Sequence, residues 1–332
     1  MTEPGTTTKS PPPGPVFISG RQHSGNTVLT LITGRIDGCL ALEQEGLFFE
    51  HRGRLDAMKD ARSRADWIAG HLYLGNDDLS SRVKEHLGDW ASRHPEADAL
   101  VLYRRAMCFV TETTENRFWI QKATSYIFYA NELLTSMPEA RFIYLIRNPY
   151  DVCASKKNRR PTYEHVVGWV ISWNKGIRLA RRIARRFPDR VHLVRYEELV
   201  AHSERTVRSV CRFIGAPYQP SLLEVPHVNP SEDPYQVQAD TRGLTDVRVN
   251  RYLDQLSPSE CAALDALLDS TALEQFYPDL PHRGRTYSWA ARLGAAGLIL
   301  TGPLRYGFDQ IRFARRYGLP LIRRTLRQIR PT

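Results

Sequence analysis

The chain has few cysteines. Among 332 residues there are five, Cys39, Cys108, Cys153, Cys211 and Cys261, an odd number with no two close together. No pair has the short spacing of a zinc ribbon or of a redox-active dithiol. We therefore expect a reducing compartment, the cytoplasm, and no metal site.

Long hydrophobic runs are also missing. Residues 1–13 are rich in Thr, Pro and Gly and contain no apolar stretch, so we expect a flexible leader rather than a secretory signal or an anchor. The uncharged stretch Leu293 to Leu304 has only twelve residues, whereas a helix needs about 20 to cross a bilayer. Hydrophobic residues make up 42% of the chain and charged residues 25%, which is ordinary for a globular protein.

Lysine is absent from the last fifty residues, and the charge there is unbalanced. From Arg283 to Thr332 the chain has eleven arginines and one acid, Asp309, which together account for its whole net charge of +10. The rest of the chain has 35 basic and 35 acidic side chains. A protein that binds nucleic acid or another anionic polymer through the basic tail is an alternative function, and the charge balance of the body counts against it.

The arginines of this tail alternate with apolar residues. The pattern predicts a basic amphipathic helical segment over residues 286–330, broken at Pro320, that could contact an anionic membrane surface peripherally. A helix docked on the body and a homo-oligomer contact are the alternatives. We therefore divide the chain into a leader at 1–13, one domain at 14–282 and a basic extension at 283–332.

Runs of apolar and β-branched residues alternate with helical patterns. The expected strands are Val16 to Ser19, Arg117 to Gln121, Arg141 to Ile146 and Arg190 to Arg195, and a long helix is expected over Glu164 to Phe187. This alternation predicts an α/β fold, a parallel sheet with helices on both faces. Ligands of such sheets bind beyond the carboxyl ends of the strands, so functional residues should follow each strand.

The first expected strand runs into a glycine-containing turn, Gly20 to Thr27, which precedes an apolar helix start. The spacing follows the phosphate-loop pattern GxxxxGK[ST], in which backbone N–H groups and the helix N-terminus hold an anion. Asn26 stands where that pattern has Lys, and no metal-binding Asp is evident after a later strand. A kinase or nucleoside triphosphatase is therefore disfavoured, and a turn without a chemical role remains the alternative.

A second anion site is predicted after the third strand. Arg147 follows that strand directly, Pro149 and Asp151 fit the start of a helix, and Ser155 comes one to two turns later. A guanidinium binds phosphate through two hydrogen bonds, and a hydroxyl can complete such a site. A surface ion pair is the commoner role of an isolated Arg, but two anion sites at neighbouring strand ends favour a nucleotide with two phosphate groups.

These motifs together resemble the PAPS-dependent sulfotransferase superfamily, close to its bacterial and protein-tyrosine branches, over residues 14–280. PAPS is 3′-phosphoadenosine 5′-phosphosulfate. The resemblance rests on the loop Gly20 to Leu29, on Arg147 with Pro149 and Ser155, and on the segment Arg195 to Leu199. It implies a P-loop-type sulfotransferase fold and transfer of a sulfuryl group from PAPS to a small-molecule or saccharide acceptor, the hydroxyl of a sugar, alcohol or phenol.

The resemblance also implies roles for single residues. The expected donor-binding residues are Arg21, Gln22, His23, Ser24, Gly25, Asn26 and Thr27 at the 5′-phosphosulfate, Arg147, Ser155 and Arg159 at the 3′-phosphate, Tyr196 near the adenosine and Arg251 folded over the donor. The family usually has Arg at the position of His23. Arg21 or Lys122 then becomes the candidate source of the missing cation, with His23 a charged or hydrogen-bonding partner.

The reacting end needs a cation for the leaving group and a base for the acceptor hydroxyl. Lys122 follows the second expected strand, in a turn that resembles the family's, and is the candidate cation. Glu45 lies in a segment that resembles the family's acidic and aromatic segment, and is the candidate base, with Glu43 as the alternative. Exposed acids without a catalytic role remain the other interpretation of both glutamates. His23 is the third candidate catalytic residue.

Overall fold

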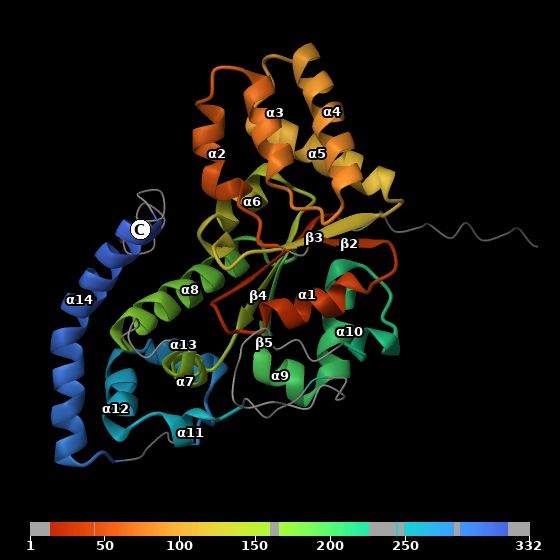
Figure 1. Cartoon of the computed structure of the whole chain (residues 1–332). Helices are drawn as coiled ribbons and strands as arrows, with labels where there is room; N and C mark the ends of the chain where they lie inside the picture. The colour runs from red at the N-terminus through yellow and green to blue at the C-terminus, as the bar shows by residue number, and fades with distance from the viewer. Residues whose placement is uncertain are drawn as a thin grey trace, which may run out of the picture.

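The computed structural model describes residues 14–42, 44–159, 166–225, 244, 249–281 and 286–317. In this part of the chain a parallel five-stranded sheet with the order β2-β3-β1-β4-β5 forms the centre (Figure 1). The strands are β1 (Val16–Gly20), β2 (Cys39–Leu42), β3 (Phe118–Lys122), β4 (Arg141–Ile146) and β5 (Val191–Arg195). The predicted α/β fold is confirmed, and four strands lie within a residue of their expected bounds. β2 was not expected, because it is only four residues long and largely half-buried.

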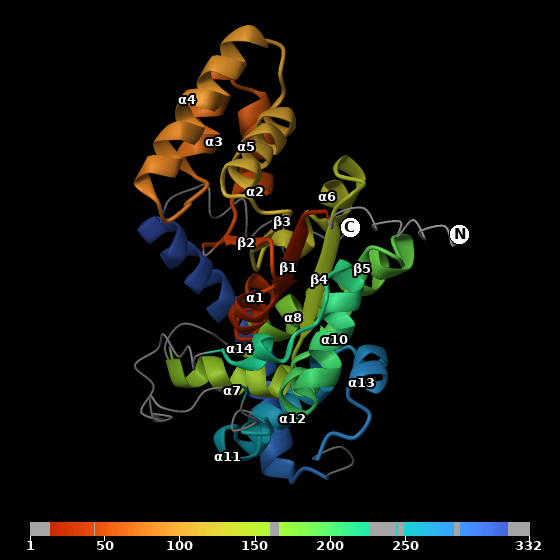
Figure 2. The ribbon, with the colours of Figure 1, turned by 90° about the vertical axis from the view of Figure 1, so that its right-hand side faces the viewer.

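Side chains of the central strand alternate between two hydrophobic cores, one on each face of the sheet. Val16 and Ile18 belong to one core, whereas Phe17 belongs to the other. The first core is covered by α1 (Asn26–Gly34) and α10 (Ser203–Ile214), and the second by α5 (Ala99–Thr113) and α8 (Val166–Arg186). Figures 1 and 2 show these helices on opposite sides of the sheet. The arrangement leaves the loops at the carboxyl ends of the strands to form a site.

A group of four helices is inserted between β2 and β3. They are α2 (Phe48–Asp56), α3 (Ala61–Gly70), α4 (Asp77–Arg93) and α5, and they stand together at one end of the molecule (Figures 1 and 2). Asp60, Asn76 and Asp98 are the N-caps of the last three, each accepting a backbone N–H bond. The ring of Tyr103 on α5 stacks on Phe48 with 4.2 Å between ring centroids, which fixes α2 against α5.

The remaining described helices follow the third and later strands. They are the 3₁₀ turns η1 (Tyr126–Phe128) and η2 (Pro220–Leu223), and the helices α6 (Ala130–Ser136), α7 (Pro149–Arg159), α9 (Tyr196–Ala201), α11 (Tyr252–Gln255), α12 (Pro258–Leu267), α13 (Ser270–Phe276) and α14 (Trp289–Tyr317). α12 begins with a capping box formed by Ser257 and Glu260.

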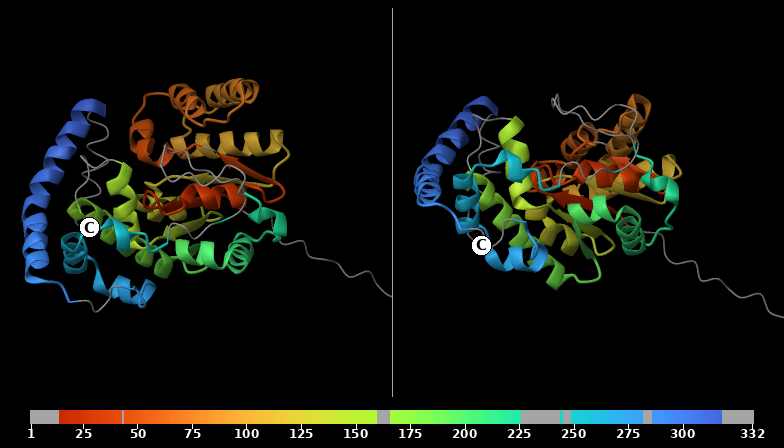
Figure 3. Two further views of the ribbon diagram at one scale, coloured as in Figure 1. Left: turned by 60° about the horizontal axis from the view of Figure 1, so that its bottom comes forward. Right: turned by 90° about the horizontal axis from the view of Figure 1, so that it is seen from below.

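The last helix, α14, lies within the basic extension. α14 packs along α12 and α8 and forms one edge of the molecule (Figure 3). Among the described residues, no helix is both long enough and apolar enough to cross a membrane. The predicted leader 1–13, Glu43, the side chain of Arg159 and the break at Pro320 lie outside the described residues.

Candidate active site

The loop between β1 and α1 has the shape that an anion site requires. His23 and Gly25 have φ angles of 66° and 93°, so the backbone enters the left-handed region twice within three residues. The N–H of Ser24 donates to the carbonyl of Arg21 at 3.0 Å and closes the turn. Gly25 is the N-cap of α1 and has no side chain to cap it, and no acid lies in the first turn. The first N–H groups of α1 are therefore available to an anion.

Asn26 ties the helix start to the end of β1. Its Nδ2 donates to the carbonyl of Gly20 at 2.9 Å, so the side chain folds back onto the loop where a Lys would extend outward. Its Oδ1 is buried and has no hydrogen-bond partner within the described part of the chain. Thr27, the next residue, is exposed on the first turn of the helix. The loop thus keeps polar groups for a ligand without the charge of a phosphate-loop lysine.

Arg147 and Tyr196 hold this loop from the neighbouring strands. Nη1 of Arg147, at the end of β4, donates to the carbonyl of His23 at 2.6 Å. The guanidinium lies 4.5 Å from the ring centroid of Tyr196, which follows β5. The same ring packs on Gly25, where a Cβ atom would come within 2.6 Å of the Tyr196 ring. The structure therefore brings the three predicted motifs together, with Tyr196 buried against the loop.

A buried network positions Arg147 in turn. Nε1 of Trp173 on α8 donates to the carbonyl of Arg147 at 3.1 Å. Next to it, Glu197 accepts the N–H of Asn148 at 2.9 Å and the hydroxyl of Tyr277 at 3.0 Å. Burial raises the pKa of Glu197 above its usual value, although these donors and the charge of Arg147 oppose the rise. No role for Trp173, Glu197 or Tyr277 was predicted from the sequence, although Glu197 lies inside the segment Arg195 to Leu199.

Asp151 anchors the segment that contains Arg251. Its carboxylate accepts the backbone N–H of Asn250 at 2.8 Å and that of Tyr252 at 3.0 Å, so Arg251 sits between two fixed residues. Burial raises the pKa of Asp151, and the charge of Arg147 and these backbone N–H groups act in the opposite direction. Asp151 lies on α7, the helix that also bears the half-buried Ser155. The helix α7 therefore positions both candidate residues, Ser155 as one of its own residues and Arg251 through the bonds of Asp151.

Glu45 and Lys122 are neighbours at the carboxyl end of β3. The N–H of Gly46 donates to the carbonyl of Lys122 at 3.1 Å, and Thr124 Oγ1 donates to Glu45 Oε2 at 3.4 Å. Gly46 lies so close to Tyr126 that a Cβ atom would sit 1.7 Å from its hydroxyl oxygen. The segment can pass only with glycine at this position, which fixes Glu45 beside Lys122.

Arg21 points away from the loop toward α8. A Cβ atom added to Gly176 would lie 3.2 Å from Cδ of Arg21, and the Arg21 guanidinium is 6.0 Å from the ring centroid of Phe128. Nζ of Lys175 lies 5.7 Å from the same centroid. Burial, followed by the charge of Arg178, lowers the pKa of Lys175. The structure places the two candidate cations differently: Arg21 beside α8 and Lys122 beside Glu45.

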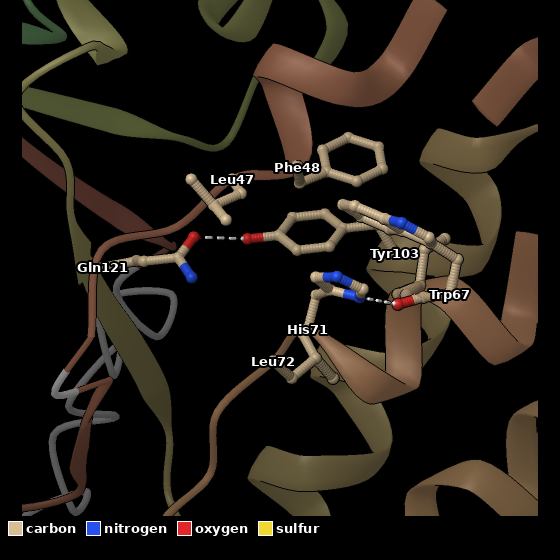
Figure 4. Close-up of a pocket in the computed structure, with 8 residues that line it drawn as sticks. Leu47, Phe48, Trp67, His71, Leu72, Tyr103 and Gln121 are labelled. Atoms are coloured by element: carbon tan, nitrogen blue, oxygen red, sulfur yellow. Dashed lines mark hydrogen bonds between the residues drawn. The ribbon is translucent and has the colours of Figure 1, made fainter. Parts of the chain in front are cut away.

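An aromatic pocket borders this reacting end (Figure 4). It is lined by Leu47, Phe48, Trp67, Ile68, His71, Leu72, Tyr103 and Gln121. The hydroxyl of Tyr103 donates to Gln121 Oε1 at 2.8 Å, and Nδ1 of His71 donates to the Trp67 carbonyl at 2.7 Å. Leu47 comes two residues after Glu45 and Gln121 directly precedes Lys122, so the pocket adjoins both candidate groups. This pocket was not predicted from the sequence, because its lining residues come from four separate segments.

The described loop can hold an anionic group at the start of α1, and Glu45 and Lys122 lie at the end of β3, the strand that pairs with β1. These are the groups that in-line transfer to a hydroxyl needs: fixed positive charge for the leaving group and a base for the acceptor proton. Within the described residues, no three His, Cys, Asp or Glu side chains gather as metal ligands.

Glu197 makes the pH dependence of stability testable. Because its pKa is higher in the folded than in the unfolded chain, its contribution to stability is greatest at acidic pH and falls as the pH rises from the unfolded value toward the folded one. We expect a Glu197→Gln variant to gain free energy of unfolding relative to the wild type between pH 4 and 7, by about 1.4 kcal/mol for each unit of pKa difference.

Urea denaturation at a series of pH values measures this difference. Glu204→Gln, which changes an exposed glutamate on α10, is the control and should show little change with pH. A Glu197→Gln variant that loses stability relative to the wild type as the pH rises would contradict the assignment.

Comparison with known proteins gives a family. The model of the Sulfotransferase family matches residues 15–220. Among solved structures, the sulfotransferase domain of the Synechococcus PCC 7002 olefin synthase is 19% identical, with a TM-score of 0.46, over 91% of this chain and 98% of that one. A sulfotransferase domain from the curacin biosynthetic pathway is also 19% identical, with a TM-score of 0.45, over 87% and 99%.

A mouse sulfotransferase complexed with PAP is 12% identical, with a TM-score of 0.38, over 85% of this chain and 88% of that one. No curated protein matches the chain significantly. The family match covers more than half of the chain and includes the loop after β1, Arg147 and Tyr196. The chain therefore belongs to the sulfotransferase family, and it is a transferase of sulfuryl groups.

Proposed function

We propose that the sulfuryl donor is PAPS and that the chain transfers its sulfuryl group to a hydroxyl. The observation that carries this proposal is the contact between two anion sites: Arg147, the candidate 3′-phosphate ligand, also binds the loop that would hold the 5′-phosphosulfate. A donor with phosphate groups at both ends of its ribose matches two such sites. Asn26 in the lysine position matches a nucleotide without a γ-phosphate.

We assign the donor to residues of the three motifs. The N–H groups at the start of α1, with Asn26 and the exposed Thr27, would bind the 5′ side, and Arg147 with Ser155 would bind the 3′-phosphate. Arg251 is held near this end by Asp151. Arg159 is proposed as a further 3′-phosphate contact from the sequence alone.

In the transfer step, the acceptor oxygen forms a bond to sulfur while the bond from sulfur to the 5′-phosphate oxygen breaks. Glu45 takes the proton of the acceptor hydroxyl. Lys122 offsets the negative charge that develops on the leaving phosphate. Arg147 and the loop hold the donor in line, so that positioning supplies much of the rate. We propose that these cations meet the charge demand without a metal ion, since the loop lacks the Lys and the partner Asp of a metal-nucleotide site.

The aromatic pocket supports an alcohol or phenol with an apolar body as the acceptor, in preference to a sugar. Most of its lining side chains are apolar or aromatic, and its polar groups, His71, Tyr103 and Gln121, are few. The pocket encloses only about 230 Å³, less than the roughly 300–1,000 Å³ of typical ligand pockets. An acceptor ring would therefore enter it by displacing the half-buried side chains of Trp67 and His71, and a small number of hydrogen bonds would then orient it. With Nδ1 of His71 donating to a carbonyl, its Nε2 is left as an acceptor that can orient a hydroxyl.

We also propose a cytoplasmic location. None of the five cysteines forms a disulfide in the described structure, and Cys153 and Cys211 are buried. Burial raises the pKa of Cys39 to about 12, which keeps its thiol protonated. Cysteines that form no disulfides fit a reducing compartment.

Nucleotide binding tests the donor. We expect adenosine 3′,5′-bisphosphate to raise the unfolding temperature more than ATP or AMP, because it alone fills both anion sites. Arg147→Lys should weaken the binding of the bisphosphate about tenfold to hundredfold, the loss of a charge-assisted hydrogen bond of about 1.5–3 kcal/mol, and should weaken AMP binding less, through the loop that Arg147 also binds. Calorimetric titration measures these affinities.

Ser155→Ala tests the same site without disturbing the contact of Arg147 with the loop, and Ser81→Ala on α4 is its matched control. Stabilisation by ATP alone would replace this proposal with a kinase-like activity. Equal affinity of the wild type for the bisphosphate and for AMP would remove the second anion site.

Glu45→Gln tests the base. We expect its kcat to fall by about 10²–10⁴, with unchanged affinity for adenosine 3′,5′-bisphosphate, because the amide cannot accept the proton. Transfer from radiolabelled PAPS to naphthol measures the rate. Glu43→Gln is the matched variant. If it alone lost activity, the role of base would pass to Glu43, and full turnover of Glu45→Gln would end the assignment.

A panel of acceptors tests the pocket. We expect naphthol and long-chain alcohols to be sulfated with much higher kcat/KM than monosaccharides, and Trp67→Ala to raise KM for naphthol at least several-fold by removing apolar contact. The donor KM should stay the same. Preference for saccharides, or an unchanged naphthol KM in Trp67→Ala, would show that the acceptor binds elsewhere.

A further inference from the structure

The outer face of α14 is unusually apolar for an exposed surface. Trp289, Leu293, Leu300 and Leu304 are 78%, 66%, 77% and 69% exposed. Their spacing places them on one side of the helix, where exposed Ala296 and Pro303 also fall. We call these six residues the α14 stripe. Single exposed leucines are common, but a continuous stripe of them usually marks a contact surface.

The opposite side of α14 is the one that packs on the protein. Ala291 and Ala295 are buried, and Leu298 and Ile299 pack against the main core. In Figures 1 and 3 the helix lies at the edge of the molecule, with α8 and α12 on its inner side only. Among the described elements nothing covers the α14 stripe, so its occupant comes from outside this part of the chain.

Charge indicates which occupant fits. The stretch 293–304 has no charged residue, Arg292 precedes it and Arg305 follows it, and the chain beyond Arg305 contains seven more arginines against one acid. Two copies of this helix packed face to face would bring together two sets of arginines, and their repulsion would oppose the contact. An anionic lipid surface instead attracts the arginines and accepts the apolar side chains between them.

Length decides how the helix meets the lipid. Twelve uncharged residues extend about 18 Å in a helix, well short of the roughly 30 Å of the hydrocarbon core. The inner side of α14 is also occupied by α8 and α12. The helix can therefore lie along a membrane but cannot cross it.

We propose that the α14 stripe docks this protein peripherally on anionic membranes, with the stripe inserted among the lipids and the flanking arginines on the headgroups. This proposal is independent of the donor and of the acceptor.

Vesicle flotation of the full chain tests the proposal. We expect binding to vesicles of phosphatidylcholine with phosphatidylglycerol to exceed binding to phosphatidylcholine alone at least about tenfold. The binding should fall when salt is raised from about 0.1 M to about 0.5 M. The affinity of the triple variant Leu293→Gln, Leu300→Gln, Leu304→Gln for anionic vesicles should be at least about tenfold lower than that of the wild type, because the variant keeps every arginine and loses the apolar contact.

The triple substitution is chosen over deletion, because removal of α14 would uncover α8 and α12. Val101→Gln, which changes an exposed apolar residue of α5, is the matched control and should bind vesicles as the wild type does. The unfolding temperature and its rise with adenosine 3′,5′-bisphosphate report whether each variant is folded.

Three outcomes would overturn the proposal. The first is full vesicle binding by the triple variant, since arginines alone would then carry it. The second is equal binding to neutral and anionic vesicles. The third is a wild-type dimer in analytical ultracentrifugation that the triple variant loses, with no vesicle binding by either protein, which would make a second copy the occupant.

Discussion

The hydrogen bond from Arg147 to the carbonyl of His23 is the contact on which the site depends. It joins the end of β4 to the loop that follows β1, and the same guanidinium lies over Tyr196, whose ring supports Gly25. Three motifs that are far apart in sequence therefore form one unit. A buried guanidinium is stable only when its charge is compensated. The His23 carbonyl, the Tyr196 ring and the nearby carboxylates supply that compensation, and a bound phosphate would add to it.

The sequence was sufficient for the fold class and for four of the five described strands, because the pattern of alternating strands and helices is local. It also located the loop, Arg147 and Lys122, since each follows a strand directly. The contacts that position these residues were not predictable in the same way. Asp151 accepts the N–H groups of Asn250 and Tyr252, which lie 99 and 101 positions later in the chain. The hydroxyl of Tyr277 donates to Glu197, which lies 80 positions earlier. Such pairs leave no periodic signal in the chain, because only the folded backbone brings them together.

His23 shows how a departure from a family pattern can keep the structure of a loop. Its backbone adopts a positive φ angle, which His tolerates better than most residues other than glycine, and its carbonyl rather than its side chain is bound by Arg147. The replacement of Arg by His therefore alters the charge at this position and leaves the backbone contact intact. Lys122 stands on the reacting side of the site and Arg21 on the side of α8.

The insertion of α2 to α5 between β2 and β3 puts the candidate donor site and the aromatic pocket on different parts of the chain. The candidate donor-binding residues lie in the loops after β1, β4 and β5, whereas the pocket is lined mainly by residues of α2, α3 and α5 and of the segments next to them. Leu47 and Gln121 connect the two parts. Substitutions in the inserted helices can therefore change which acceptor the enzyme uses and leave the donor unchanged. New acceptor ranges can evolve, or be engineered, on an unaltered donor site.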